Sequence, residues 1–131
     1  MPNYRKLTWV AVTVLVLVTL STVSVFAAEA CVVKQRMNCS GIDLTGYHFD
    51  GAALRNSTMD DANMTSTTMY GTNWSGSSMQ NTDFTNAITV NADFRRVDFT
   101  GSNITQAQFD AAFSYQNAIL PDGTKARRNN K

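Results

Sequence analysis

The sequence has few of the residues from which most functional sites are built. Its 131 residues include two cysteines and one histidine, too few for the four protein ligands of a closed zinc site. Only 16% of the residues are charged and the formal net charge is +1, which argues against a protein that neutralises many phosphates of a nucleic acid. The length gives one domain at most, so a large multidomain enzyme is excluded.

The N-terminal part has the pattern of a membrane-directed segment. Residues 7–28 contain no charge and follow a basic start. With the small residues after them, they predict a signal peptide over residues 1–30, cleaved before Cys31 or after Ala27. The alternative is an uncleaved anchor, because 22 residues at about 1.5 Å each can cross a hydrocarbon layer of about 30 Å. Either way, we expect a secreted or periplasmic protein, or one anchored in the membrane and facing outside the cytoplasm.

The two cysteines lie close together after this segment. Because an exported chain with an even cysteine count commonly forms disulfides, Cys31 and Cys39 are predicted to pair; two free buried thiols are the alternative. Bacterial lipoprotein processing at Cys31 is a third option. The motif for that processing has leucine or a similar residue three positions before the cysteine, whereas Ala28 and the charged Glu29 precede Cys31 here.

A period of five residues runs through the rest of the chain. Every fifth residue from 44 to 104 is large and apolar in twelve of thirteen cases. These central positions are Leu44, Phe49, Leu54, Met59, Met64, Met69, Trp74, Met79, Phe84, Thr89, Phe94, Phe99 and Ile104. Neither a helical stripe nor a strand alternation produces this spacing.

The positions around each central residue are specialised as well. Two residues before it the side chain is small in eleven of thirteen cases, Ile42 and Tyr47 being the exceptions. One residue before it, Asp or Asn occurs seven times. Two residues after it, Gly, Asn or Asp occurs ten times, and these residues accept the positive φ of the third position in a type II turn. The sequence therefore predicts a tight turn every five residues.

This pattern resembles the pentapeptide-repeat family, whose motif is Ala, then Asp or Asn, then Leu or Phe, then two variable residues. Ala62-Asn63-Met64 and Ala92-Asp93-Phe94 match it closely, and the resemblance covers residues 42–104 without a gap. It implies an all-β fold, a right-handed quadrilateral β-helix with one pentapeptide per side and about three coils. Polar Thr89, between two β-branched residues, predicts a local distortion of the helix.

Both ends of this solenoid are predicted to be covered. Residues 31–41 are expected to form an N-terminal cap. A capping-box pattern and apolar residues at helical spacing predict a C-terminal helical cap over residues 105–124, with the helix at about residues 106–115. Such a cap would block end-to-end stacking of molecules. Residues 125–131 are read as a basic tail.

Folding the repeat at about 20 residues per coil aligns two ranks of polar side chains. The ranks are Asp43, Asn63, Asp83 and Asn103, and Thr45, Thr65, Thr85 and Thr105. One interpretation is stabilisation by side-chain ladders, in which asparagines separate the aspartates. The other is a flat face that recognises a partner. Threonine ranks also occur on ice-binding β-helices, although those usually have two ranks on one face.

No chemistry of catalysis follows from the remaining residues. The methionines at central positions, Met59, Met64, Met69 and Met79, suggest copper binding in an exported protein, but their inward phase favours core packing. His48 is predicted to point outward, and no nucleophile or carboxylate is obliged to lie near it. We expect no enzyme activity, no cofactor and no metal site.

The function expected is therefore an exported, non-catalytic structural or protein-interaction module. Its partner is an unknown protein or component of the cell envelope rather than a nucleic acid, with membrane contact only through residues 7–28 if they are retained. The resemblance also implies an alternative, because some family members protect gyrase by imitating DNA. Residues 42–104 contain seven aspartates and three arginines, a net charge of −4, but they form a short shaft and follow an export signal. An enzyme of unrecognised type is the third alternative.

Overall fold

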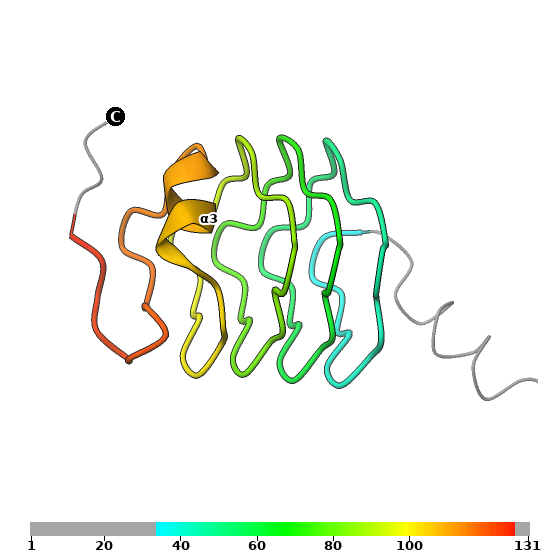
Figure 1. Ribbon diagram of the computed structural model, residues 1–131, viewed down its shortest axis with the longest axis horizontal. Helices are drawn as coiled ribbons and strands as arrows, with labels where there is room; N and C mark the ends of the chain where they lie inside the picture. Colours follow the sequence, from blue (N-terminus) through cyan, green and yellow to red (C-terminus); the bar gives the residue numbers. More distant parts are fainter. Residues whose placement is uncertain (1–33, 128–131) are drawn as a thin grey trace, which may run out of the picture. The chain divides into compact units, whose positions relative to one another are not determined.

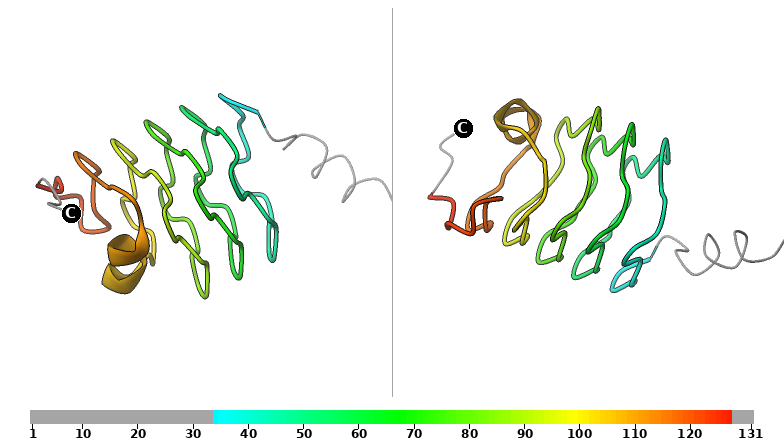
Figure 2. Two further views of the ribbon diagram at one scale, coloured as in Figure 1. Left: turned by 90° about the horizontal axis from the view of Figure 1, so that it is seen from above. Right: turned by 60° about the horizontal axis from the view of Figure 1, so that its bottom comes forward.

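The computed structural model describes residues 34–127. The chain winds into a stack of similar coils that lie side by side in all three ribbon views (Figure 1, Figure 2). Parallel bridges join residues 20 positions apart along four ladders, each on its own side of the coil. The ladders run through residues 38, 58, 78 and 98; 43, 63 and 83; 48, 68 and 88; and 53, 73 and 93.

A turn closes each corner of the coil. In the repeat centred on Leu44, the Tyr47 N–H donates to the Leu44 carbonyl at 2.9 Å, and Gly46 has a φ of 70°. Every fifth residue from 36 to 101 has a φ between 54° and 75°. The predicted positive φ is therefore confirmed, and it extends to Ser66 and Arg96, whose residue types do not favour it.

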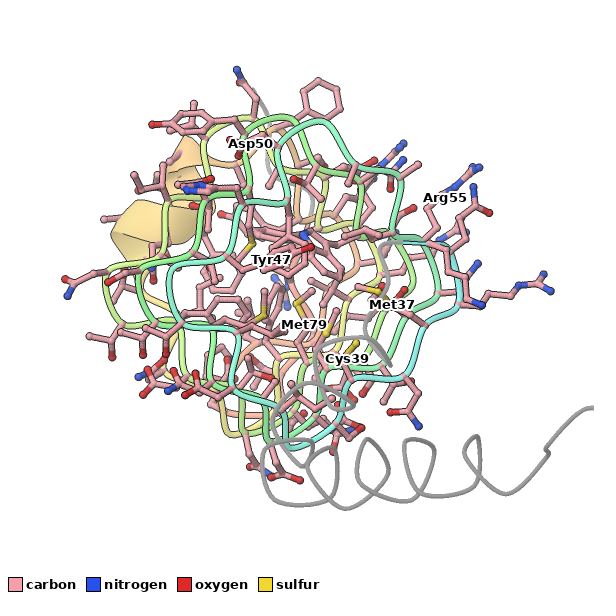
Figure 3. All side chains as sticks on the ribbon, turned by 90° about the vertical axis from the view of Figure 1, so that its right-hand side faces the viewer. Met37, Cys39, Tyr47, Asp50, Arg55 and Met79 are labelled. Carbon is pink, nitrogen blue, oxygen red and sulfur yellow. The ribbon has the colours of Figure 1, made fainter. Side chains whose placement is uncertain are left out.

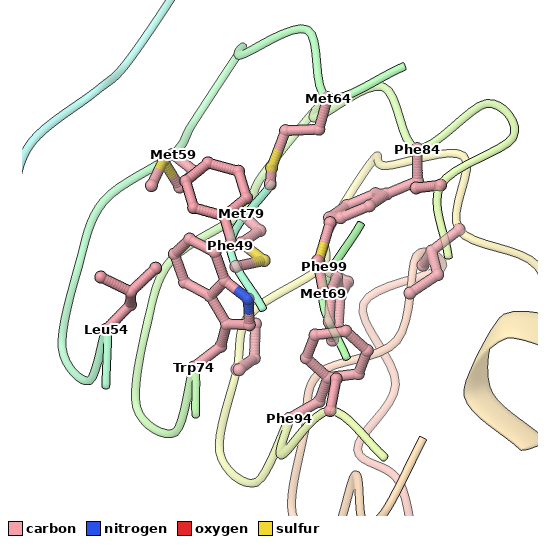
Figure 4. Close-up of a cluster of buried hydrophobic side chains, with 14 of the residues drawn as sticks. Phe49, Leu54, Met59, Met64, Met69, Trp74, Met79, Phe84, Phe94 and Phe99 are labelled. Carbon is pink, nitrogen blue, oxygen red and sulfur yellow. The ribbon is translucent and has the colours of Figure 1, made fainter. Parts of the chain in front are cut away.

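The interior is filled by the central residues of the repeat. All thirteen central side chains are buried, and many have no exposed surface. Figure 4 shows the larger of them clustered inside the coils. Aromatic rings meet edge to face along the stack, with Phe99 5.7 Å from Phe84, 5.2 Å from Phe94 and 5.2 Å from Phe109 between ring centroids. The central methionines are fully buried, which confirms their inward phase.

Thr89 is buried without the predicted distortion. Ile88 keeps its bridge to Thr68, so the repeat stays in register with the preceding coil, and this ladder ends at Ile88 because the helix Gln106–Ala111 takes the place of the next rung. The Thr89 hydroxyl donates to the carbonyl oxygen of Gln108 at 2.7 Å, which satisfies its polar group inside the protein. The expected distortion of this repeat was wrong, because a backbone carbonyl accepts a hydrogen bond from the buried Thr89 hydroxyl.

Small inward side chains also join the coils through hydrogen bonds. Their hydroxyl groups donate to the carbonyl of a central residue 23 positions earlier, in the preceding coil. The pairs are Thr72 to Phe49 at 2.8 Å, Ser77 to Leu54 at 3.2 Å and Thr82 to Met59 at 2.7 Å. Crowding favours small residues at these positions, and the hydroxyl groups add a direct link between coils.

The solenoid begins earlier than predicted. Asn38 is bridged to Thr58, and Cys39 is fully buried at the phase of a central residue, so part of the expected cap at residues 31–41 belongs to the first coil. Tyr47 packs its ring 4.7 Å from Phe49 and is 43% exposed. The end-on view shows Tyr47 across the middle of this end (Figure 3). A large residue is tolerated there because no coil precedes it in the described part of the chain.

Helix α3, Gln106–Ala111, interrupts the last part of the stack (Figure 1). The predicted capping box is present, since Thr105 and Gln108 each accept a hydrogen bond from the other's backbone N–H. The helix ends before residue 115 because the chain returns to the ladder: the Phe113 N–H donates to the Ala92 carbonyl at 2.9 Å.

The coil resumes after α3 with one additional residue. Asp93 is bridged to Ser114 and Asp98 to Ile119, at an offset of 21 rather than 20. The repeats therefore do not end at residue 104, and the stack has more than the three coils expected. Residues 105–124 are not purely a helical cap, since those between α3 and Leu120 continue the solenoid.

The chain finally folds back on its last rung. Ile119 pairs with Lys125 in an antiparallel bridge, and the Leu120 N–H donates to the Thr124 carbonyl at 2.7 Å. These bonds occupy backbone groups that would otherwise form an open edge. Lys125 therefore belongs to the fold and not to the tail predicted at residues 125–131.

Several expectations fall on residues outside the described range. These are the signal peptide or anchor at residues 1–30 and Cys31, so the pairing of Cys31 with the buried Cys39 stays a prediction. Within residues 34–127, no helix has the length and apolar character needed to span a bilayer.

We predict that Phe84→Asp unfolds the shaft. Phe84 is fully buried, and a carboxylate in its place would be an unpaired charge in an apolar interior, which costs several kcal/mol. Circular dichroism should show loss of the β signal and of the cooperative melt. A variant that kept both would show that this interior admits water.

A second prediction concerns the turns. Gly46→Ala should lower the free energy of unfolding by about 1 kcal/mol, and Ser66→Gly should raise it by about 0.5 kcal/mol, because only glycine adopts positive φ without steric cost. Nothing lies within 4 Å of a Cβ placed on Gly46, so packing does not interfere. Urea denaturation measures both changes, and identical midpoints would show that these turns do not control stability.

Candidate interaction site

The predicted polar face is present over three rungs. Asp43 is bridged to Asn63 and Asn63 to Asp83, so their side chains follow one another on one ladder. Thr45, Thr65 and Thr85 occupy the adjoining corner, one at each rung. We refer to Asp43, Thr45, Asn63, Thr65, Asp83 and Thr85 as the Asx/Thr face.

Each Asp or Asn of this face bonds within its own repeat. The N–H and hydroxyl of Thr45 donate to the same Asp43 oxygen at 3.0 and 2.6 Å. Thr85 bonds to Asp83 in the same way at 2.9 and 2.6 Å. At the middle rung, the Thr65 N–H donates to Asn63 at 3.0 Å. These side chains fix the turns, so the face is a rigid array.

The fourth rung does not continue the face. The Asn103 side-chain oxygen accepts from the Phe84 N–H at 2.6 Å, in the place that a backbone carbonyl takes at the other rungs. Its amide nitrogen donates to Asp83 at 2.7 Å and to Thr85 at 3.1 Å. Thr105 serves as the N-cap of α3. The predicted ranks of four therefore end after three members, because the chain leaves the ladder to start the helix.

Hydrogen bonds keep the carboxylates of this face ionised. The Thr45 hydroxyl and N–H lower the pKa of Asp43. The Thr85 hydroxyl and the Asn103 amide, followed by the Thr85 N–H, lower the pKa of Asp83. Two coils separate these carboxylates, about 10 Å, with the neutral Asn63 between them. The face is thus negatively charged with little self-repulsion at physiological ionic strength.

His48 and the other potential ligands do not form a cluster in residues 34–127. His48 is exposed, as predicted, and its Nδ1 lies 2.8 Å from the Thr68 hydroxyl. In this part of the chain, no three side chains among His, Cys, Asp and Glu are grouped so that they could hold a metal ion.

A polar groove of about 400 Å³ was not anticipated from the sequence. It follows the corner between the ladder at residues 53, 73 and 93 and the ladder at residues 58, 78 and 98. Its lining consists of Arg55, Asn56, Ser75, Gly76, Arg95, Arg96, Gln116 and Asn117. The 20-residue spacing that aligned the Asx/Thr face also aligns Arg55, Ser75 and Arg95, so the sequence contained a signal for a corner rich in arginine. Gln116 and Asn117 are offset by 21 because of the residue added at α3. We call this feature the arginine groove.

The repeat pattern and its coiled geometry decide the family. The chain matches the family described as pentapeptide repeats, in eight copies, over residues 38–76 and 77–113. It belongs to the pentapeptide repeat family. The shaft is accordingly a right-handed quadrilateral β-helix, as the resemblance implied.

Solved structures of pentapeptide repeat proteins resemble this chain. HetL from the cyanobacterium Nostoc, involved in heterocyst differentiation regulation, aligns with a TM-score of 0.60 and 22% identity over 70% of this chain. The chain spans 42% of the length of HetL. A pentapeptide repeat protein from the thylakoid lumen of Arabidopsis thaliana aligns with a TM-score of 0.30 and 19% identity, over 66% of this chain and 70% of the other. No curated protein matches the sequence.

Proposed function

We propose that this pentapeptide repeat protein is an exported, non-catalytic module that presents a rigid surface to a protein or cell-envelope partner. The observation that carries the proposal is the fixed spacing of surface side chains on a solid shaft. All thirteen central side chains are buried, and the backbone ladders hold each corner at one register. Such a surface loses little conformational entropy when it binds.

The fold and the related proteins support an interaction role. HetL, which shares the fold, is described as involved in heterocyst differentiation regulation. Regulation through protein contacts is compatible with a scaffold whose interior is occupied by its own side chains.

The N-terminal pattern supports export. Residues 7–28 carry no charge, and a basic start and small residues flank them. Export places the module outside the cytoplasm, where its partner would be another exported protein or an envelope component. A cytoplasmic target such as gyrase is then out of reach, which disfavours DNA mimicry.

The Asx/Thr face is the surface we propose for the protein partner. It is regular over three rungs, its carboxylates are ionised, and local hydrogen bonds fix its side chains. The same bonds also stabilise the turns. Partner recognition and turn stabilisation predict different effects of a substitution at Thr65. The bond from the Thr65 backbone N–H to Asn63 survives replacement of the side chain, so the turn should keep its stability while a partner contact would be lost.

Thr65→Lys should abolish partner capture and leave the melting temperature within about 2 °C of the wild type, because a surface change away from special features alters stability little. The assay is affinity capture from cell-envelope extracts, followed by mass spectrometry. Thr100→Lys is the matched control, with the same residue type at the equivalent turn position on another corner. Equal capture by both variants would reject the Asx/Thr face as the interface.

Export is tested separately by cell fractionation. A C-terminally tagged protein should be found mainly outside the cytoplasm, in the periplasm, the medium or the membrane fraction. Immunoblotting measures its distribution, and a cytoplasmic marker provides the control for lysis. A full-length protein that stays mostly in the cytosol would overturn the proposal of export and restore the gyrase alternative.

A further inference from the structure

The arginine groove has walls and a floor set by three successive coils. Arg55 lies on one coil, Ser75 and Gly76 on the next, and Arg95 and Arg96 on the third. Ser75, a small residue on the middle coil, leaves a depression between the two arginine rungs, and the Asn56 side chain lies against Gly76 beside it. Two coil spacings separate these rungs, about 10 Å along the shaft, and flexible arginine side chains can reach across that distance.

The positive charges of residues 42–104 are concentrated at this corner. All three arginines of residues 42–104 line the groove, and none of the seven aspartates in that window does. In the end-on view, Arg55 extends away from the shaft on one side, while Asp50 lies toward another corner (Figure 3). A shaft with a net charge of −4 over this window therefore carries one positive groove.

Two of the three arginines have no acidic partner in the described part of the chain. Arg95 is paired with Asp93, with 2.6 Å between Nη2 and Oδ2, whereas Arg55 and Arg96 form no ion pair with any residue in 34–127. The groove thus has an excess of two positive charges. Two guanidinium groups match the charge of a single phosphate dianion and can bind its oxygens through paired N–H donors.

Arg96 also occupies a conformation that does not suit its residue type. Its φ is 60°, while Asn56, Gly76 and Asn117 occupy the corresponding positions at this corner in other coils. Arg36 at the same corner has a φ of 61°, so arginine recurs at this unfavourable position on this side of the shaft. Left-handed backbone is sterically unfavourable for a residue with a side chain. The turn imposes this conformation at every corner, so the strain itself belongs to the fold, and only the presence of arginine there needs a further reason.

We propose that the arginine groove binds a phosphate group, with Arg55 and Arg96 as its two charged ligands and Ser75-Gly76 as the floor. The site goes beyond the proposed protein interaction and does not depend on it, because it lies on a different corner from the Asx/Thr face. The phosphate comes either as the free ion or as a monoester, and both present the same oxygens to the two guanidinium groups.

Titration of the protein, purified in its natural processed form, tests this proposal. Sodium phosphate should shift the backbone amide NMR signals of Ser75, Gly76 and Arg96 with a dissociation constant of about 1 mM, and sodium chloride of equal ionic strength should not. Arg55→Gln and Arg96→Gln should each weaken binding about tenfold, as expected for loss of a charged hydrogen bond. Lys125→Gln, which removes the same charge elsewhere, should change it less than twofold.

An occlusion variant separates the groove from general electrostatics. Ser75→Tyr should abolish the shifts with all arginines retained, and Thr100→Tyr, at the equivalent turn position on another corner, should not. A melting curve shows that both variants are folded. Glycerol 3-phosphate is the second probe: tighter binding than inorganic phosphate identifies an esterified ligand, and equal or weaker binding identifies the free ion.

Three results would overturn the site. They are no shift with either phosphate, equal shifts with sodium chloride, or equal loss of affinity in Lys125→Gln and Arg55→Gln. None of these results bears on partner capture through Thr65. The phosphate site and the proposed interaction module can therefore fail independently.

Discussion

The structure depends on hydrogen bonding between backbones that lie one coil apart. Parallel bridges keep an offset of 20 residues from Asn38 to Asp98, so each side of the coil receives the same repeat position every fourth pentapeptide. A single extra residue would move all later side chains out of phase. The chain adds one only at α3, after which the offset is 21 and the Gln108 side-chain amide bonds to the carbonyls of Phe84 and Ala87 at 2.8 and 2.9 Å. The helix thus absorbs a change that the ladder could not.

This register explains why the central positions accept varied residues. Leucine, methionine, phenylalanine and Trp74 all fill the interior, where flexible methionine adapts to the spaces that the other side chains leave. Thr89 is accepted because its hydroxyl has a partner at Gln108. Trp74 is fully buried, and its indole N–H has no partner in the structure, so its packing has to offset the loss of a hydrogen bond to water.

Periodicity was sufficient to predict the coil, the inward residues and the sites of positive φ, since those follow from local sterics and burial. Periodicity alone placed both ends of the solenoid wrongly. Met37 and Cys39 continue the inward phases and the family match begins at residue 38, but a cysteine at the central position was interpreted as part of a disulfide-bonded cap. Asn103 and Thr105 fit their ranks by number, yet the first replaces a backbone acceptor and the second caps α3. Such roles depend on where the chain leaves the ladder, which spacing alone does not reveal.

The residue types on the surface are constrained differently from those in the interior. The first residue of each turn contributes neither to the core nor to the positive-φ position, so it is free to vary, and Thr45, Asp50, Arg55 and Tyr70 all occupy it. A charge at that position needs no structural explanation. Arg96 differs, because it stands at the second turn residue, where its left-handed backbone is less stable than that of glycine or asparagine. Since stability of the coil does not require arginine there, a use for its side chain accounts for it better than the fold does.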